Sequence, residues 1–228
     1  MAPPAPSVDQ VTVFVIDPSN ISEERAHAAL IPSELDQAQR FHFKKDATHW
    51  RACRCALREI LAGSLRIEPA EVRLQFGDFG KPLLQTPLED LHFNLSHCHD
   101  LALVVLCHVG SVGIDVESAD RAPSLIGCES AFCHLSEIAQ LPDAPPQRAE
   151  MLLNLWTKKE ALLKAIGTGM SLAPQSVSLA AGQEDLSADL RLSSLHCHRL
   201  HHPLLDDHIA HLAVPKTVKQ SDIAILSH

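Results

Sequence analysis

The strongest constraint on the fold is a pair of long helical segments, one in each half of the 228-residue chain. Lys45–Ala62 (KDATHWRACRCALREILA) and the segment from about Gln147 to Ile166 predict helices, and each is followed by a glycine, Gly63 or Gly167, that can end it. Short apolar or alternating segments, which predict strands, flank both helices. The order of elements therefore repeats, although no residue-level repeat is present, and this favours two comparable α/β halves.

The predicted strands are short and occur in both halves. The first half contains Val11–Ile16, Glu71–Phe76, Leu91–Leu95 and Leu101–Val109, and the second half contains Ser111–Glu117, Ser176–Ala180, Asp207–Val214 and Ser221–Leu226. Two further helices are predicted over Ser33–Phe43 and Ala131–Leu141. We therefore expect an α+β fold with two pseudo-symmetric subdomains, residues 1–109 and 110–228, each a small antiparallel-type sheet with a long helix.

The overall charge argues against a nucleic-acid-binding protein. Acidic residues number 28 and basic residues 19, which gives a formal net charge of −9. A nucleic-acid-binding domain needs a basic surface, and the absence of tyrosine, with only 4% aromatic residues, leaves few rings for base stacking. The 46% of hydrophobic residues is ordinary for a globular protein and argues against disorder.

No segment is long enough to predict a membrane span. The longest aliphatic run, Leu101–Cys107, is far shorter than the ~20 residues of a spanning helix. The N-terminal residues MAPPAPSV lack the basic and apolar regions of a secretory signal. The seven cysteines contain no CxxC pair, so we expect reduced thiols in a cytoplasmic protein.

Two acids alternate with apolar residues in the predicted strand Ser111–Glu117. In the sequence GIDVE, Ile114 and Val116 would point to the core, so Asp115 and Glu117 would share the other face. Two carboxylates so close repel each other unless a positive charge lies between them. The pair therefore fits either a solvent-exposed strand face or a site for a hard cation such as Mg²⁺, which takes carboxylate oxygens together with substrate phosphates.

The second long helix carries a stripe of side chains in the sequence WTKKEALLK. Trp156, Glu160 and Lys164 are spaced i, i+4, i+8 and so lie on one helix face. Glu160 and Lys164 alone would fit a surface ion pair worth about 0.2–0.5 kcal/mol. The large ring of Trp156 on the same face indicates that this stripe is not simply exposed to solvent.

Two weaker signals precede the acidic strand. Ser96 and His97 in FNLSH lie at the end of a predicted strand, where neighbouring side chains point to opposite faces and no GxSxG sequence surrounds the serine, which argues against a nucleophile–base pair. The turn is therefore either a plain connection or a place where a hydroxyl, an imidazole and backbone N–H groups meet a phosphate. Lys81 and Pro82 follow Gly80 in a loop that presents one cation.

In this order, FGKPLL, FNLSH, GIDVE and LWTKKEALLKAIGTGMSL together resemble the Sfp-type 4′-phosphopantetheinyl transferase family. The resemblance covers roughly Gln39–Leu179, and RFHFKKD, from Arg40 to Asp46, adds to it. It implies two pseudo-symmetric α/β halves with the active site at their junction. It also implies transfer of the phosphopantetheine arm of coenzyme A to a serine of an apo acyl or peptidyl carrier protein, with release of adenosine 3′,5′-bisphosphate.

The resemblance implies a role for each matching residue. The implied magnesium ligands are Asp115, Glu117 and Glu160. The implied coenzyme ligands are Lys159 and Lys164 at its phosphates, Lys81 and Pro82 against its nucleotide, and Ser96 and His97 near its 3′-phosphate. As a hypothesis for the mechanism, Glu160 would also act as general base toward the serine, directly or through a water, and Lys164 would protonate or shield the leaving phosphate. The family resemblance further implies a monomer.

One departure from the family pattern concerns the 3′-phosphate of the coenzyme. Family members often place basic residues just upstream of the RF sequence, but Glu34 and Gln37 stand near those places here. Coenzyme binding would then depend more on Arg40, His97 or Lys81.

Three other features suggest competing interpretations. Leu57–Ile60 (LREI) is faintly similar to the core of a Nudix motif and suggests a coenzyme A pyrophosphohydrolase, although Ala62 and Gly63 stand where paired acids should follow. A non-catalytic module that binds carrier proteins or coenzyme A is a second alternative, against which the intact acidic set argues. The stretch His196–His202 suggests a Zn²⁺ site, but its spacing fits no standard ligand set and favours a surface segment.

Overall fold

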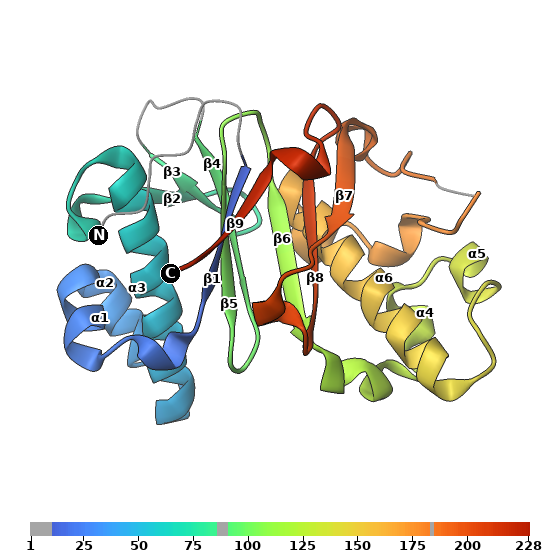
Figure 1. Cartoon of the computed structure of the whole chain (residues 1–228), viewed down its shortest axis with the longest axis horizontal. Coiled ribbons are helices and arrows are strands. Elements are labelled where there is room, and N and C mark those ends of the chain that lie inside the picture. Colours follow the sequence, from blue (N-terminus) through green and yellow to red (C-terminus); the bar gives the residue numbers. More distant parts are fainter. Residues whose placement is uncertain (1–10, 86–90, 183–184) are drawn as a thin grey trace.

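The computed structural model describes residues 11–85, 91–182 and 185–228, and it arranges them in four layers (Figure 1). A helix covers the outer face of one sheet, the inner face of that sheet packs on a second sheet, and a second long helix covers the far side. The helices are α1 Glu23–Ala29, α2 Pro32–Ala38, α3 Lys44–Leu65, α4 Glu129–Phe132, α5 Leu135–Ile138 and α6 Pro145–Ile166. The strands are β1 Val11–Ile16, β2 Leu74–Phe76, β3 Pro82–Leu84, β4 His92–His97, β5 Ala102–Cys107, β6 Gly113–Ser118, β7 Leu195–Arg199, β8 His208–Pro215 and β9 Ile223–Ser227.

The two halves share one order of elements, as the sequence predicts. The first half runs β1, α3, β4, β5 and the second runs β6, α6, β7, β8. The matching parts of the two sheets have the orders β4-β5-β1 and β7-β8-β6, and these neighbours are antiparallel. The two long helices each contain 22 residues. The expectation of two pseudo-symmetric α/β halves is therefore confirmed.

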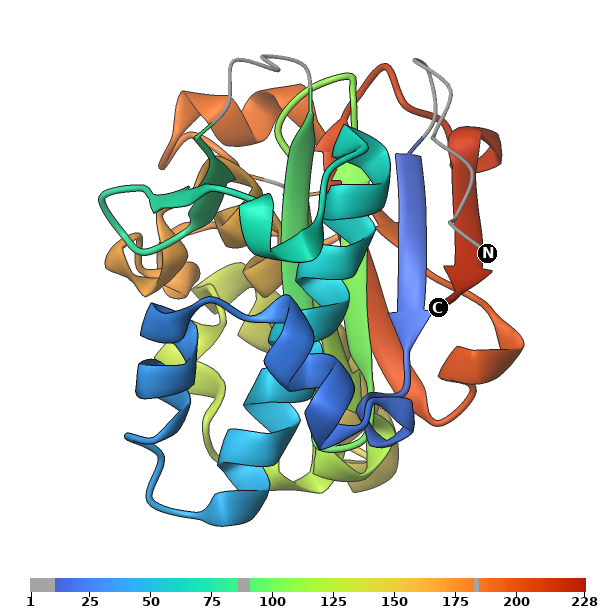
Figure 2. The ribbon, with the colours of Figure 1, turned by 90° about the vertical axis from the view of Figure 1, so that its left-hand side faces the viewer.

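The last strand departs from the predicted division of the chain. The prediction placed residues 110–228 in one subdomain, but β9 pairs in parallel with β1, beginning with Val11 opposite Ile223. Figure 2 shows these two strands side by side. Without β9, the apolar strand β1 would be an exposed sheet edge, which favours unwanted pairing between chains. The boundary near residue 109 otherwise stays a prediction.

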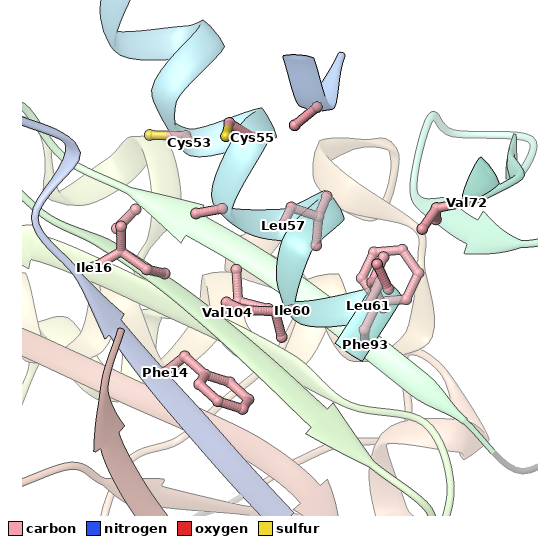
Figure 3. Close-up of a cluster of buried hydrophobic side chains, with 14 of the residues drawn as sticks. Phe14, Ile16, Cys53, Cys55, Leu57, Ile60, Leu61, Val72, Phe93 and Val104 are labelled. Carbon is pink, nitrogen blue, oxygen red and sulfur yellow. The ribbon is translucent and has the colours of Figure 1, made fainter. Parts of the chain in front are cut away.

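The buried run in β1 reflects a sheet that is covered on both faces. Phe14 and Ile16 pack toward α3, whereas Val11, Val13 and Val15 pack toward the second sheet. This alternation follows from the period of two along a strand. Figure 3 shows the first of these cores, where the α3 side chains Leu57, Ile60 and Leu61 lie over the β4 and β5 side chains Phe93 and Val104.

Several local predictions differ from the structure. Helix α2 ends at Ala38 rather than near Phe43, and the helix predicted over Ala131–Leu141 is broken into α4 and α5. Residues Ser176–Ala180 do not form a strand beyond one bridge between Ser178 and Asp185. Helix α1 was missed, although Ser22 caps it by accepting a hydrogen bond from the Arg25 backbone N–H.

Two expectations concern the membrane and the N-terminus. Within the described residues, every helix is too short or too polar to cross a bilayer. The prediction for MAPPAPSV falls on residues 1–10, which lie outside the described part of the chain.

Candidate active site

The candidate site is a cavity of about 260 Å³ where the two halves meet. Strand β4 is one edge of the first sheet and β6 is one edge of the second, and α6 runs against β6. The lining residues come from these three elements and are Leu95, Ser96, His97, Asp115, Glu117, Trp156, Glu160 and Lys164. The sequence motifs FNLSH, GIDVE and WTKKEALLK therefore converge on one space.

A glycine sets how closely β6 approaches α6. A Cβ atom at Gly113 would collide with the Ala161 carbonyl oxygen and the Ala165 nitrogen, both in the helix backbone. Only glycine leaves room for this contact. The close approach brings the acids of β6 alongside the stripe of α6. As predicted, Ile114 and Val116 point to the apolar core between the sheets.

Asp115 is at the centre of a hydrogen-bonded network. The residue is buried at 4% exposure, so it does not belong to a solvent-facing strand surface. Oδ1 accepts hydrogen bonds from Ser96 Oγ at 2.9 Å and from Lys164 Nζ at 2.6 Å. Lys164 Nζ also donates to Ser96 Oγ at 3.0 Å. The other oxygen, Oδ2, is buried and has no hydrogen-bond partner.

Side chains of the motif FNLSH connect the two sheets by hydrogen bonds. Asn94 Oδ1 accepts from the Ile114 N–H at 3.0 Å, and Ser96 Oγ accepts from the Val116 N–H at 3.3 Å. Because β6 is a sheet edge, these N–H groups have no strand partner on that side. Alternate residues of a strand share a face, so Asn94 lies on the same face as Ser96. This alternation could have identified Asn94 as a site residue from the sequence, but only Ser96 and His97 were selected.

Glu117 is held by an aromatic and a basic side chain. It forms an ion pair with Arg121, four residues further along the chain, and a hydrogen bond with Trp156. The Arg121 guanidinium also lies over the Trp156 ring, 5.1 Å from its centre. Burial raises the pKa of Glu117 despite the charge of Arg121, and nearby Asp115 raises it further. Arg121 was not selected from the sequence.

Glu160 is half-buried and incompletely paired. Its Oε1 atom is buried without a hydrogen-bond partner. Burial raises its pKa, which Lys164 opposes and the charges of Asp115 and Glu117 reinforce. A cation near these carboxylates would relieve both the repulsion and the missing bonds.

The acidic set has the donor chemistry that a magnesium ion requires. Carboxylate oxygens are its preferred protein ligands, and two of those present, on Asp115 and Glu160, are buried without partners. Within the described residues, however, the three carboxylates are not gathered within 4.8 Å of one another. Lys164 takes one oxygen of Asp115, and Arg121 takes one oxygen of Glu117.

Lys81 and Pro82 line a second cavity, of about 200 Å³, that shares Leu95 and Lys164 with the first. Lys81 Nζ donates to the Val112 carbonyl at 3.0 Å and to the Ala165 carbonyl at 2.9 Å, so it joins the loop before β3 to the second half. Burial lowers its pKa to about 8. Two of its three N–H groups are used, which leaves one for a ligand.

His97 stands at the mouth of the first cavity. Part of the side chain is exposed, yet removal from water, followed by the effects of His49 and Lys164, lowers its pKa to about 4. The ring is therefore neutral near pH 7. Arg40, two residues after α2, is exposed and does not line either cavity.

Glu34, noted as a departure from the family pattern, has a structural role. It pairs with the buried side chains of Arg58, at 2.5 Å, and Arg54, at 3.4 Å. Arg58 belongs to the Nudix-like LREI sequence, and Glu59 of the same sequence pairs with Arg25 at 2.6 Å. This sequence therefore holds the first half together and contributes nothing to the cavities.

The structure contradicts the expected role of Lys159 at the coenzyme. The side chain is only 2% exposed, and its Nζ donates to the Phe132, Pro174 and Val177 carbonyls at 2.8–2.9 Å. It also pairs with the fully buried Glu137 at 2.7 Å. No N–H remains for a phosphate, because these partners use all three donors. On a helix, Lys159 faces away from the stripe that contains Glu160 and Lys164.

The histidine-rich stretch His196–His202 forms part of β7 and the turn after it. The rings of His196 and His198 are 4.5 Å apart. Among the described residues, the trios whose metal-ligand atoms lie within 4.8 Å of one another include none of these histidines.

Both halves of the chain match models of one enzyme family. Residues 17–108 match the 4′-phosphopantetheinyl transferase N-terminal model, and residues 111–213 match the 4′-phosphopantetheinyl transferase superfamily model. A 4′-phosphopantetheinyl transferase of Bacillus subtilis is 30% identical over 69% of each chain. These matches show that the chain belongs to the 4′-phosphopantetheinyl transferase superfamily.

Two further relatives show how far the similarity extends. The 4′-phosphopantetheinyl transferase HetI of a Nostoc species is 35% identical over 63% of this chain, and the match spans 62% of HetI. The 4′-phosphopantetheinyl transferase Sfp of Bacillus subtilis is 26% identical over 73% of each chain.

Proposed function

We propose that this protein transfers the 4′-phosphopantetheine arm of coenzyme A to a serine of an apo acyl or peptidyl carrier protein and releases adenosine 3′,5′-bisphosphate. One observation carries the proposal: Asp115 and Glu117 of β6 meet Glu160 and Lys164 of α6 in a single cavity between the halves. Membership of the family supports the same reaction.

The two adjoining cavities would divide the coenzyme between them. Lys81 and Pro82, in the second cavity, would lie against the nucleotide, and the ring N–H of His97 would donate a hydrogen bond to the 3′-phosphate. Lys164 lines both cavities and so would lie beside the pyrophosphate. Its positive charge would attract and partly neutralise the negative charge of the phosphates. Arg40 would contribute only if it turned inward from its exposed position.

Asp115, Glu117 and Glu160 would hold a magnesium ion, and the unpartnered oxygens of Asp115 and Glu160 support this. When bound, the ion would supply positive charge to the pyrophosphate oxygens. Ser96 would keep Asp115 oriented, because its hydroxyl bonds both the carboxylate and Lys164.

Glu160 would act as general base toward the carrier serine. The serine oxygen forms a bond to the phosphorus that bears pantetheine, and the serine proton passes to a Glu160 carboxylate oxygen. The bond from that phosphorus to the bridging oxygen breaks, and adenosine 3′,5′-bisphosphate departs with the electron pair. Lys164 would shield or protonate this leaving phosphate.

The deciding experiment incubates the protein with coenzyme A, Mg²⁺ and an apo carrier protein, and follows the mass of the carrier. We expect the carrier to gain one phosphopantetheine arm. Free phosphopantetheine without a change in the carrier would instead identify a pyrophosphohydrolase, and absence of turnover would identify a binding module. A carrier with its acceptor serine replaced by alanine is the control and should not gain mass.

We further propose that the protein works as a monomer in the cytoplasm. All seven cysteines are unpaired, which suits a reducing compartment. Light scattering after size-exclusion chromatography tests the monomer, and a mass near that of two chains would contradict it.

A further inference from the structure

Three side chains outside the acidic set lie together beside the active-site cavity. His49 and Cys53 come from α3, and His97 comes from the end of β4. One ligand atom from each lies within 4.8 Å of those of the other two. The Cys53 Sγ and His49 Nε2 atoms are 3.5 Å apart, and the centres of the two imidazole rings are 5.1 Å apart.

The spacing of His49 and Cys53 is the one that places two ligands on one helix face. Residues i and i+4 stand one above the other, as in helical metal-binding motifs. Cys53 is only 1% exposed and lies on α3 where the helix packs on the first sheet (Figure 3). Two ligands are thus carried by a rigid, well-packed element.

A hydrogen bond to the backbone of Cys98 holds the His49 ring in place. Histidines that bind metals usually use their second ring nitrogen in this way, which orients the first nitrogen toward the ion. A thiol–imidazole hydrogen bond would account for His49 and Cys53 alone. It does not account for His97, which approaches the same point from another element.

An ion can reach His49 and His97 from solvent. His49 and His97 line a cavity of about 340 Å³ together with Lys45, Asp46 and Trp50. Water from this cavity would complete a tetrahedral set of two imidazoles, one thiolate and one solvent ligand, which is typical of zinc sites that keep an open position. Hard ions such as Mg²⁺ prefer oxygen ligands and do not suit this set.

The protonation of the three groups is compatible with zinc. Burial lowers the pKa values of His49 and His97, so both rings are neutral and free to bind a metal near pH 7. Burial raises the pKa of the Cys53 thiol to about 12. Binding would therefore release the thiol proton to solvent as the sulfur–zinc bond forms.

We propose that His49, Cys53 and His97 form a Zn²⁺ site, and that zinc bound there withdraws His97 from coenzyme A and so inhibits the enzyme. The inhibition rests on the proposed function, whereas the metal site does not. By linkage, coenzyme A would weaken zinc binding by the same factor as zinc weakens coenzyme binding.

A neighbouring trio is the main competitor for the ion. Cys98 Sγ lies 3.3 Å from Asp100 Oδ1, and His208 Nε2 lies 3.1 Å from the same oxygen. The ion pair of His208 with the half-exposed Asp100 already accounts for that arrangement. The two sites differ in their cysteine, which allows them to be separated.

The first test titrates the metal-free protein with Co²⁺ in the absence of coenzyme A and records thiolate-to-cobalt charge-transfer absorption. We expect the charge-transfer absorption to saturate at one equivalent of thiolate-bound cobalt, to be lost in Cys53→Ser, and to be kept in Cys98→Ser and in the exposed-cysteine control Cys128→Ser. His49→Gln replaces Cys53→Ser if the latter does not fold, and tetrahedral absorption should weaken in it. Retention of the wild-type spectrum in both variants, or its loss only in Cys98→Ser, overturns the site.

The second test measures transfer at saturating Mg²⁺ while Zn²⁺ is raised to one equivalent above the protein. We expect the wild-type rate to fall at least tenfold, to recover when coenzyme A is raised, and to be insensitive to zinc in Cys53→Ser. A zinc-loaded wild-type enzyme at full rate would overturn the inhibition. A protein without transfer activity under any condition would overturn the proposed function, while the cobalt titration would still decide the metal site.

Discussion

Helix α6 carries two lysines in two different kinds of charge network. Lys159 and Lys164 are five positions apart, and each forms an ion pair with a buried acid: Glu137 at 2.7 Å and Asp115 at 2.6 Å. In sequence the two look alike, and family resemblance suggested that both bind the phosphates of the coenzyme. The structure separates them.

The difference lies in how completely each network is satisfied. Three backbone carbonyls complete the bonds of Lys159, and Glu137 also accepts from the His134 and Leu179 N–H groups. Around Lys164, by contrast, the oxygens Asp115 Oδ2 and Glu160 Oε1 are buried without partners. A closed network stabilises the fold, whereas one with unpaired buried oxygens is poised to bind a ligand.

The largest expected effect is on the rate of transfer, when the network around Lys164 is changed. Replacing Asp115, Glu117 or Glu160 with alanine should lower the rate of transfer by about 10³-fold or more, since each removes a group that would act on the developing charge. Initial rates at saturating Mg²⁺, with thermal melting to verify folding, measure this. Near-normal transfer by any one variant would show that its carboxylate is not a ligand.

Changes in the network around Lys159 and Glu137 should lower the stability of the fold. Lys159→Met leaves the buried Glu137 carboxyl group without its cationic partner, so we expect the free energy of unfolding to fall by about 3–5 kcal/mol. Urea denaturation measures it, with the adjacent Lys158→Met as a control that should change much less. A loss below about 1 kcal/mol would mean that Lys159 is not a structural residue.

Lys164→Met should separate the two networks most directly. We expect kcat to fall about 100-fold with a smaller loss of coenzyme affinity, because the charge matters most at the leaving phosphate. Steady-state kinetics and direct binding of coenzyme A measure the two quantities. If binding were lost and kcat retained, Lys164 would be a binding residue only.

His211 of β8 contacts the same helix, α6, through an uncharged hydrogen bond. Its buried ring lies 2.8 Å from Thr157 Oγ1, and burial lowers its pKa from 6.5 to about 3. Between these values only the unfolded chain takes up the proton, so stability is lost as the pH falls from about 6.5 toward 3. The titration of this single histidine should make the free energy of unfolding about 2 kcal/mol lower at pH 5 than at pH 7 and above.

Urea denaturation of the wild type and His211→Asn at both pH values checks the effect. The variant should lose less stability than the wild type between pH 7 and pH 5. Equal losses would show that His211 does not titrate differently in the folded and unfolded chains.

The local features of this protein could be read from the amino-acid sequence. The alternation of Asp115 and Glu117 with apolar neighbours and the stripe of Trp156, Glu160 and Lys164 depend only on the periods of a strand and a helix. The repeated order of elements likewise predicts the two halves, because each element must bury one apolar face. These patterns were sufficient to select most of the cavity lining.

Long-range contacts decided the rest. The sequence does not show that β9 crosses back to β1, that Glu34 pairs with Arg54 and Arg58, or that Asn94 fastens β4 to β6. The partners in each case are far apart along the chain and their positions follow from packing. The same reason separates Lys159 from Lys164. The helical period alone places the two lysines on different faces of α6. Only the tertiary fold determines that one face packs against Glu137 and backbone carbonyls, and that the other lines the cavity.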